Sequence, residues 1–173
     1  MKLNELQPEQ YELFVDMDGV VADFEQGVSG AMGERLDQAR YDRDSKYRNK
    51  MWKWVKEYSK QGGKLWAELP MMADAMTLWN YVKKYNPQIL TAQGNPAYGA
   101  EPQKRQWIAD KFGSNVNVIV TQKSREKAQH AAPNRILIDD RDKAIGPWRE
   151  AGGIGILHTS AADTIRQLKE LGL

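Results

Sequence analysis

Five short, mostly apolar runs punctuate the sequence, and each of them ends on polar or small residues. Apolar runs of this length that end on turn-forming residues are typical of buried strands. The runs are Leu13–Val15, Ile89–Leu90, Val116–Val120, Ile136–Ile138 and Ile154–Leu157. Stretches with helical character lie between most of them, and strands that alternate with helices predict a parallel sheet in an α/β fold.

The intervening stretches carry helical signals. From Met72 to Tyr85, apolar residues recur at positions 72, 75, 76, 79 and 82, which is the stripe of an amphipathic helix. The stretch Pro102–Phe112 has proline near its first turn and Gly113 directly after it. The remaining predicted helices are Ser124–Ala132, Pro147–Ala151 and Ala161–Leu171, the last with Ser160 as its N-cap.

The segment from about Glu25 to Glu68 has no strand-like run and is rich in charged and aromatic residues. It predicts a few helices inserted after the first strand. We therefore expect one Rossmann-like, three-layer α/β sandwich with a parallel sheet of about five strands. Its core domain would comprise residues 1–24 and 69–173, and a small helical cap would comprise residues 25–68.

Composition excludes several kinds of site. The chain has no cysteine and only two histidines, His130 and His158. This excludes disulfides, thiolate zinc sites, iron–sulfur clusters and cysteine nucleophiles, and it makes a multi-histidine metal site improbable. A metal bound here would have carboxylate ligands, and magnesium is the hard cation that such ligands suit.

Net charge and hydropathy limit the kinds of partner that the chain is expected to bind. The formal net charge of +2 gives no electrostatic case for binding a nucleic-acid polymer or an acidic membrane. No run approaches the roughly 20 apolar residues that span a bilayer, and Met1–Gln10 shows no apolar leader. We expect a cytoplasmic protein that acts on a small molecule, and a homodimer is left open.

Carboxylates follow the first and the fourth predicted strands, as Asp16 and Asp18 and as Asp139 and Asp140. In a parallel sheet, ligands bind beyond the carboxyl ends of the strands. Four acidic side chains at one edge would repel one another strongly, and a divalent cation offsets that repulsion. The sequence therefore predicts a magnesium site built from these four aspartates.

The same edge has the groups that phosphoryl transfer requires. One aspartate of the first pair would attack phosphorus, and the other would protonate the leaving oxygen and later activate water. The hydroxyl of Thr91 follows the second strand, and Lys127 follows the third. These two residues, backbone N–H groups and magnesium would stabilise charge on the phosphoryl oxygens.

Four motifs, in order and with matching spacing, make the chain resemble the haloacid dehalogenase (HAD) superfamily of phosphatases. They are Asp16-Met17-Asp18-Gly19-Val20-Val21-Ala22-Asp23-Phe24, Thr91 after Ile89-Leu90, Lys127 in Ser124-Arg125-Glu126-Lys127, and Ile136-Leu137-Ile138-Asp139-Asp140-Arg141. The extended first motif and the small insert after it most resemble the 5′(3′)-deoxyribonucleotidase branch and related bacterial and phage phosphatases.

The resemblance implies a role for each matching position. Asp16 would be the nucleophile and a magnesium ligand, and Asp18 would be the general acid and base and would also give its carbonyl oxygen to the metal. Thr91, Ala92 and Lys127 would bind the phosphate. Asp139 would be the main metal ligand of the fourth motif, supported by Asp140, although the order of these two is open. Lys123 is a rival for Lys127.

Residues near the predicted cap are candidates for contact with the rest of the substrate. These are Phe24, Trp52 and Arg141. We expect a magnesium-dependent phosphomonoester hydrolase that acts through an aspartyl-phosphate, on nucleoside monophosphates. The alternatives are a phosphatase for another small ester such as a sugar phosphate, a phosphomutase, or a non-catalytic binding module. The Thr-Ser-Pro that is typical of the nucleotidase branch is replaced here by Thr91-Ala92-Gln93-Gly94-Asn95-Pro96, which leaves nucleotide specificity open.

Overall fold

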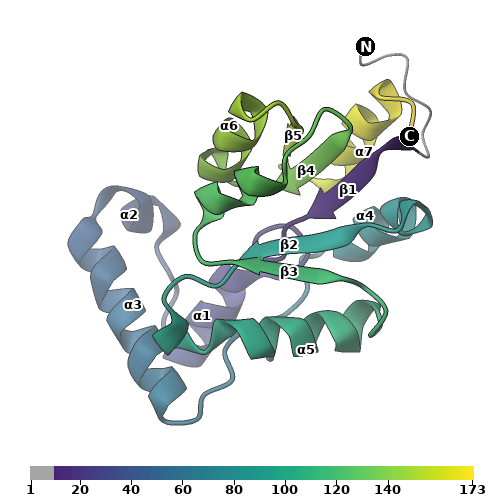
Figure 1. Cartoon of the computed structure of the whole chain (residues 1–173). Helices are drawn as coiled ribbons and strands as arrows, with labels where there is room; N and C mark the ends of the chain where they lie inside the picture. Colours follow the sequence, from purple (N-terminus) through teal and green to yellow (C-terminus); the bar gives the residue numbers. More distant parts are fainter. Residues whose placement is uncertain (1–9) are drawn as a thin grey trace.

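The computed structural model of the chain describes residues 10–173, so residues 1–9 of the expected core domain lie outside the described part. Five parallel strands form one sheet in the order β3-β2-β1-β4-β5. They are β1 (Glu12–Val15), β2 (Gln88–Ala92), β3 (Val118–Thr121), β4 (Arg135–Asp139) and β5 (Ile154–Leu157). The predicted α/β fold with a five-stranded parallel sheet is therefore confirmed (Figure 1).

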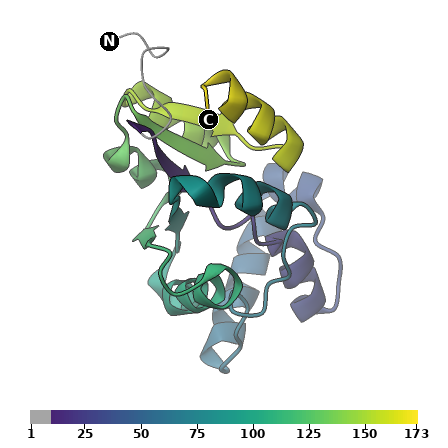
Figure 2. The ribbon, with the colours of Figure 1, turned by 90° about the vertical axis from the view of Figure 1, so that its right-hand side faces the viewer.

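Apolar side chains cover both faces of the sheet. Leu13 and Val15 of β1 belong to one buried cluster, and Phe14, which points to the opposite face, belongs to another. The first cluster includes residues of α4 (Ala75–Val82), α5 (Ala100–Phe112) and α7 (Ala161–Glu170). The second includes Trp148 of α6 (Asp142–Glu150), whose ring lies 5.6 Å from that of Phe14. Figure 2 views the molecule from the side of α4 and α7.

The register of the sheet brings the ends of β1 and β4 level. Val15 is paired with Ile138 of β4 and with Ile89 of β2. The pairing continues one residue further, because the Asp16 N–H donates to the Ile138 carbonyl at 2.9 Å. The residues that follow β1 and β4 therefore emerge side by side at the carboxyl edge of the sheet.

Three helices are inserted between β1 and α4, namely α1 (Phe24–Met32), α2 (Gln38–Arg43) and α3 (Ser45–Lys60). Asp23 is the N-cap of α1, since its Oδ1 accepts from the Gln26 N–H at 2.9 Å. The chain leaves the insert beside the point where it entered, because Ala22 and Met71 form an antiparallel bridge. In Figure 1 the strand arrows point toward these helices.

Some helix boundaries differ from the prediction. The helix expected at Pro147–Ala151 is α6, which begins at Asp142 and contains Pro147. It begins early because the N–H groups of Ala144 and Ile145 donate to the Arg141 carbonyl, upstream of the proline. Similarly, α4 begins at Ala75, because Met72 donates its N–H to the Val21 carbonyl next to the insert.

The stretch expected as a helix over Ser124–Ala132 is the 3₁₀ helix η5 (Ser124–His130). The predicted N-cap of the last helix is confirmed, because the Ser160 hydroxyl accepts from the Asp163 N–H at 3.1 Å. Among the described residues no helix has the length and apolar character needed to cross a membrane.

Candidate active site

A tight loop leads from β1 into α1. The Gly19 N–H donates to the Ala22 carbonyl at 2.8 Å, and the Val21 N–H donates to the Met17 carbonyl at 3.0 Å. Gly19 has a φ of +81°, and a Cβ built on it would lie 2.2 Å from Oδ2 of Asp140. Only glycine fits here, because it accepts positive φ and lets the Asp140 carboxylate approach the loop backbone.

Three of the four predicted aspartates form a cluster at the carboxyl edge of the sheet. Asp16, Asp139 and Asp140 each offer a carboxylate oxygen within 4.8 Å of the others. Burial, reinforced by the charge of Asp16, raises the pKa of Asp139 to about 6. Burial and the charges of Asp16 and Asp139 raise the pKa of Asp140 to about 7. The cations near the cluster therefore do not fully compensate the negative charge of the three carboxylates.

The predicted Lys127 lies among these aspartates. Its Nζ is 2.8 Å from Oδ1 of Asp16 and 2.6 Å from Oδ2 of Asp139, and its side chain is only 1% exposed. Burial opposes its charge, but the two carboxylates overcome that effect and raise the pKa of Lys127. Lys123, the rival candidate, is exposed. The geometry therefore favours Lys127 for the position beside Asp16.

The two aspartates of the fourth motif differ in their partners. Both oxygens of Asp139 are engaged, since Oδ2 accepts from Lys127 and Oδ1 accepts from the Arg141 N–H at 2.9 Å. Oδ1 of Asp140 is buried and has no hydrogen-bond partner among the described residues. Asp140 therefore has an oxygen free for a ligand, whereas Asp139 is tied to the protein.

A second buried lysine, Lys104 of α5, was not expected from the motifs. Its Nζ donates to Oδ2 of Asp18 at 2.6 Å, to Oγ1 of Thr91 at 3.0 Å and to the Ala92 carbonyl at 2.7 Å. The side chain is 1% exposed. Lys104 thus joins the end of β2 to the loop after β1. A signal was present in the sequence, because Lys104 interrupts the buried stripe of Ala100, Lys104, Trp107 and Ile108 on α5.

Asp18 lies apart from the three-aspartate cluster, in contact with Lys104. Desolvation raises its pKa, Lys104 opposes that rise, and the charge of Asp16 adds to it. Oδ1 of Asp18 is buried without a hydrogen-bond partner in residues 10–173. A carboxyl group with a raised pKa and a free oxygen is suited to hold a proton for transfer.

The residues predicted to bind the phosphate lie in two places. Thr91 is fully buried, and its hydroxyl oxygen already accepts from Lys104. Ala92 is half-buried, and its carbonyl oxygen accepts from the same lysine. The structure therefore places both residues next to Asp18, while Lys127 lies next to Asp16.

Aromatic rings join the inserted helices to the loop after β2. Trp52 of α3 stacks on Phe24 at 5.7 Å and on Tyr98 at 4.9 Å, with interplanar angles of 25° and 19°. Tyr98 belongs to the 3₁₀ helix η4 (Pro96–Tyr98). The Trp52 indole N–H donates to the Tyr41 hydroxyl at 3.0 Å. Two of the predicted substrate-contact residues, Phe24 and Trp52, thus touch each other.

Arg141, the third predicted substrate-contact residue, lies next to the cluster. Its Nε is 3.8 Å from Oδ2 of Asp140, and its side chain is 39% exposed. This loose pairing leaves most of its N–H donors free for an anion.

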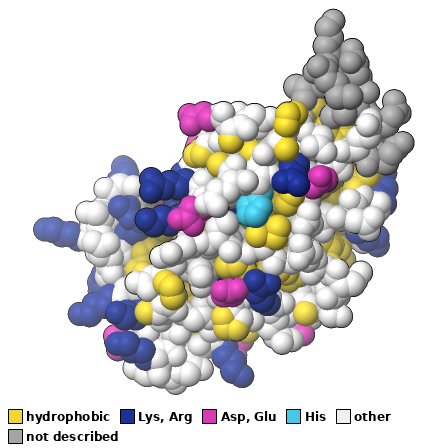
Figure 3. Space-filling view, in the orientation of Figure 1, with side chains coloured by type: hydrophobic (Ala, Val, Ile, Leu, Met, Phe, Trp, Pro, Cys, Tyr) yellow, Lys and Arg dark blue, Asp and Glu magenta, His cyan; other side chains and the backbone are white. Residues whose placement is uncertain are grey.

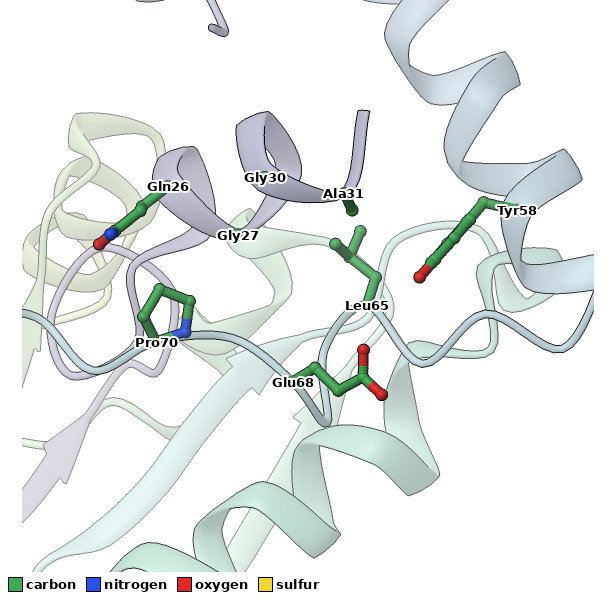
Figure 4. A pocket seen from close by; sticks show the side chains of 8 residues that line it. All are labelled: Gln26, Gly27, Gly30, Ala31, Tyr58, Leu65, Glu68 and Pro70. Carbon is green, nitrogen blue, oxygen red and sulfur yellow. The ribbon is translucent and has the colours of Figure 1, made fainter. Parts of the chain in front are cut away.

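A separate pocket of about 410 Å³ lies between α1, the end of α3 and the segment that follows it (Figure 4). Its lining includes Gln26, Tyr58 and Glu68. None of the aspartates or lysines described above lines this pocket. The candidate active site at the carboxyl edge of the sheet is therefore identified from its charged side chains, and this pocket is not part of it.

No protein-family model matches the sequence, and no curated protein sequence matches it significantly. Solved structures with a similar fold exist. A haloacid dehalogenase-like family hydrolase from Streptococcus pneumoniae aligns with a TM-score of 0.56 and 15% identity, over 91% of this chain and 90% of its own. A HAD family hydrolase from Deinococcus radiodurans, solved with bound phosphate and sodium, aligns with a TM-score of 0.56 and 13% identity, over 93% and 96%.

L-2-haloacid dehalogenase from Xanthobacter autotrophicus, with chloropropionic acid covalently bound, aligns with a TM-score of 0.52 and 11% identity, over 92% of this chain and 82% of its own. At such identities the likeness shows a common fold. The fold of this chain is therefore that of HAD-type hydrolases, and the chemistry has to be argued from its own residues.

Proposed function

We propose that this chain is a magnesium-dependent phosphomonoester hydrolase of the HAD type, and that Asp16 is its nucleophile. One observation carries the proposal. The two aspartates of a single short loop are held by different buried lysines, Asp16 by Lys127 and Asp18 by Lys104. Such a separation supplies an anchored nucleophile and a distinct proton carrier within one loop, which is what a two-step phosphoryl transfer requires.

The residues present fit a hard divalent cation. The cluster offers only carboxylate oxygens, which magnesium prefers, and Oδ1 of Asp140 is buried without a partner in the described part of the chain. Asp16 and Asp140 would hold the ion through their carboxylates and Asp18 through its backbone carbonyl oxygen, and Asp139 would support them through Lys127. When bound, the metal supplies positive charge to the phosphoryl oxygens of the substrate. We thus prefer Asp140 to Asp139 as the direct ligand.

In the first step, a carboxylate oxygen of Asp16 attacks phosphorus and the bond from phosphorus to the ester oxygen breaks. Asp18 gives its proton to the departing oxygen, so an alcohol leaves and an aspartyl-phosphate remains. In the second step, Asp18 takes a proton from water, and that water attacks phosphorus. Inorganic phosphate leaves, and the carboxylate of Asp16 is restored.

The two lysines and Thr91 would act on the negative charge that develops on the phosphoryl oxygens in both steps. Lys127, 2.8 Å from Asp16, is placed to stabilise the phosphoryl oxygens beside the nucleophile. Lys104 positions Asp18 and Thr91 together, since its Nζ contacts both. Because both lysines are almost completely buried, their charges are weakly screened by water.

For the substrate we propose a nucleoside monophosphate, with the inserted helices of residues 25–68 acting as a cap. Phe24, Trp52 and Tyr98, all half-buried, stack on one another where the insert meets the loop after β2, and a planar group could extend this stack. A nucleobase stacks on such faces with about 1–3 kcal/mol per base. The aromatic rings between the insert and the core thus favour a substrate with a planar base next to its phosphate over a sugar phosphate.

A phosphomonoester panel tests this function. We expect release of inorganic phosphate from p-nitrophenyl phosphate only with magnesium, and faster release from dUMP or dTMP than from sugar phosphates. Asp16→Asn should be inactive with unchanged circular dichroism. Failure of every ester with magnesium would overturn the proposal. Isomerisation of a sugar phosphate without net phosphate release would indicate a phosphomutase, and hydrolysis of 2-chloropropionate would indicate a dehalogenase.

A further inference from the structure

Exposed lysines line one side of α3. Four of them recur at spacings of four, three and seven residues, which places them on one face of the helix. They are Lys46, Lys50, Lys53 and Lys60, which we call the lysine stripe. The buried residues of α3, Met51 and Val55, lie on the opposite face. The stripe therefore faces solvent, along about 21 Å of the helix axis.

The charge of the chain is unevenly distributed. Helix α3 has six lysine or arginine residues and one glutamate, which is a formal charge of +5. The whole chain has +2, so the residues outside α3 together have −3. Figure 3 shows Lys and Arg side chains gathered on the flank where α2 and α3 lie. The expectation that the chain binds no nucleic-acid polymer rests on the net charge, which averages over this basic helix.

Most charges of the stripe are not neutralised by the protein. Within residues 10–173 the stripe has one ion pair, between Lys60 and Glu57 at 3.0 Å. The hydrogen bond from Lys60 lowers the pKa of Glu57, and the charges of Lys56 and Lys53 lower it further. One carboxylate thus lies among several ammonium groups. Because like charges repel, a polyanion that lies along the stripe would relieve this repulsion.

The exposed side of α3 fits a phosphate backbone better than a lipid surface. Helices that lie on membranes bury a face of large apolar side chains among the lipids. Among the described residues the one large hydrophobic side chain that is exposed, Met76, belongs to α4. The stripe therefore has charge for an anionic surface but no large apolar side chain to insert into it.

The stripe also fits a duplex better than an unpaired strand. Proteins that bind single strands stack the bases on aromatic side chains. The rings of α3 are already stacked within the protein, Trp54 on Tyr58 and Trp52 on Tyr98, each pair at 4.9 Å. A duplex needs no stacking platform, and it presents a phosphate about every 3.4 Å along each strand. A straight row of lysines can therefore contact several of its phosphates.

We propose that the lysine stripe of α3 binds the phosphate backbone of a nucleic-acid duplex without reading its sequence. This inference goes beyond the proposed function and does not depend on it. The aspartates of the candidate active site lie at the carboxyl edge of the sheet, whereas the stripe lies on the solvent side of α3. The chain thus has separate places for a small substrate and for a duplex.

Fluorescence anisotropy with a short labelled DNA duplex tests the stripe. Wild type should bind with a Kd of about 1–100 µM at physiological salt, and log Kd should rise with log salt with a slope of about 3.6 for four phosphate contacts. Replacing Lys46, Lys50 and Lys53 together by glutamine should weaken binding at least about tenfold and lower the slope by about 2.7. Absence of salt-dependent binding by wild type, or an unchanged slope in the variant, would overturn the inference.

A charge-matched variant separates the stripe from overall charge. Lys83, Lys111 and Lys169 are exposed and lie outside α3. Replacing these three by glutamine removes the same charge and should leave Kd within about twofold of wild type, because exposed charges away from the contact are screened by salt. Equal weakening in the two variants would refute the stripe. Both variants should keep the circular dichroism and the thermal unfolding midpoint of wild type.

Other polyanions test the choice of partner. Vesicles that contain anionic lipid, poly-glutamate and an unpaired DNA strand should each bind more weakly than the duplex. Tighter binding to vesicles would indicate a membrane surface, tighter binding to poly-glutamate an acidic protein segment, and tighter binding to the unpaired strand a stacking site. Each of these results would overturn the inference. All readouts are of binding, so they hold whether or not the chain hydrolyses phosphate esters.

Discussion

Replacing Lys104 by methionine probes the part of the site that the motifs did not reveal. Methionine keeps the length and most of the volume of the side chain but removes the ammonium. Three contacts are lost, at 2.6 Å to Asp18, 3.0 Å to Thr91 and 2.7 Å to the Ala92 carbonyl. The variant therefore leaves the half-buried carboxylate of Asp18 and the half-buried carbonyl of Ala92 without this donor.

The cost follows from the burial of the pair. Removing one partner of a buried ion pair costs about 3–5 kcal/mol, because the other charge stays desolvated. Asp18 is 28% exposed, so water recovers part of this loss. We expect Lys104→Met to lower the free energy of unfolding by about 2–4 kcal/mol. It should also raise the pKa of Asp18 further, since Lys104 is the main group that opposes desolvation there, ahead of Lys127.

Urea denaturation at neutral pH measures the loss. Lys111→Met, an exposed position on the same helix, is the control and should stay within about 0.5 kcal/mol of wild type. Adding Asp18→Asn to Lys104→Met removes the orphaned charge, so the two losses should be non-additive by about 1–3 kcal/mol. A loss below about 1 kcal/mol for Lys104→Met, or strict additivity, would refute the reasoning.

Three further predictions concern the cluster itself. Gly19→Ala should destabilise the protein by at least about 2 kcal/mol in thermal or chemical unfolding, because the added Cβ would clash with Asp140 and the residue has a positive φ. Gly30→Ala is the control. It should be neutral or slightly stabilising, because the space around the added methyl group is open. Magnesium affinity, measured by calorimetry, should rise from pH 5.5 to 8, because Asp139 and Asp140 lose protons at pKa values of about 6 and 7. Since the folded-state value of Asp140 lies above its unfolded one, metal-free wild type should lose stability relative to Asp140→Asn as pH rises from 4 to 7, and a flat difference would contradict the value for Asp140.

The sheet could be predicted because buried parallel strands are nearly continuous apolar runs. The run Ile136–Ile138 lies inside β4, and Ile154–Leu157 coincides with β5. The meeting of Asp16 with Asp139 and Asp140 could also be predicted, since the carboxyl ends of parallel strands share one edge. These features depend on local patterns and on one topological rule.

Other features depend on packing that local patterns do not contain. Lys104 meets Asp18 across 86 positions of sequence, and only the position of α5 against the sheet brings them together. The start of α6 is set by contacts of Arg141 rather than by its internal Pro147. Likewise, the engagement of both Asp139 oxygens, which favours Asp140 as the metal ligand, depends on where Lys127 and the Arg141 N–H come to lie.

The central claim is that Asp16 accepts the phosphoryl group. Rapid acid quench of the working enzyme with substrate and magnesium, followed by mass spectrometry of the intact chain and its peptides, tests this directly. The account predicts a fraction of chains heavier by one phosphoryl group, located on Asp16, absent from Asp16→Asn and lost on treatment with hydroxylamine. Phosphate release at full rate by Asp16→Asn, or a phosphoryl group on another residue, would contradict the account.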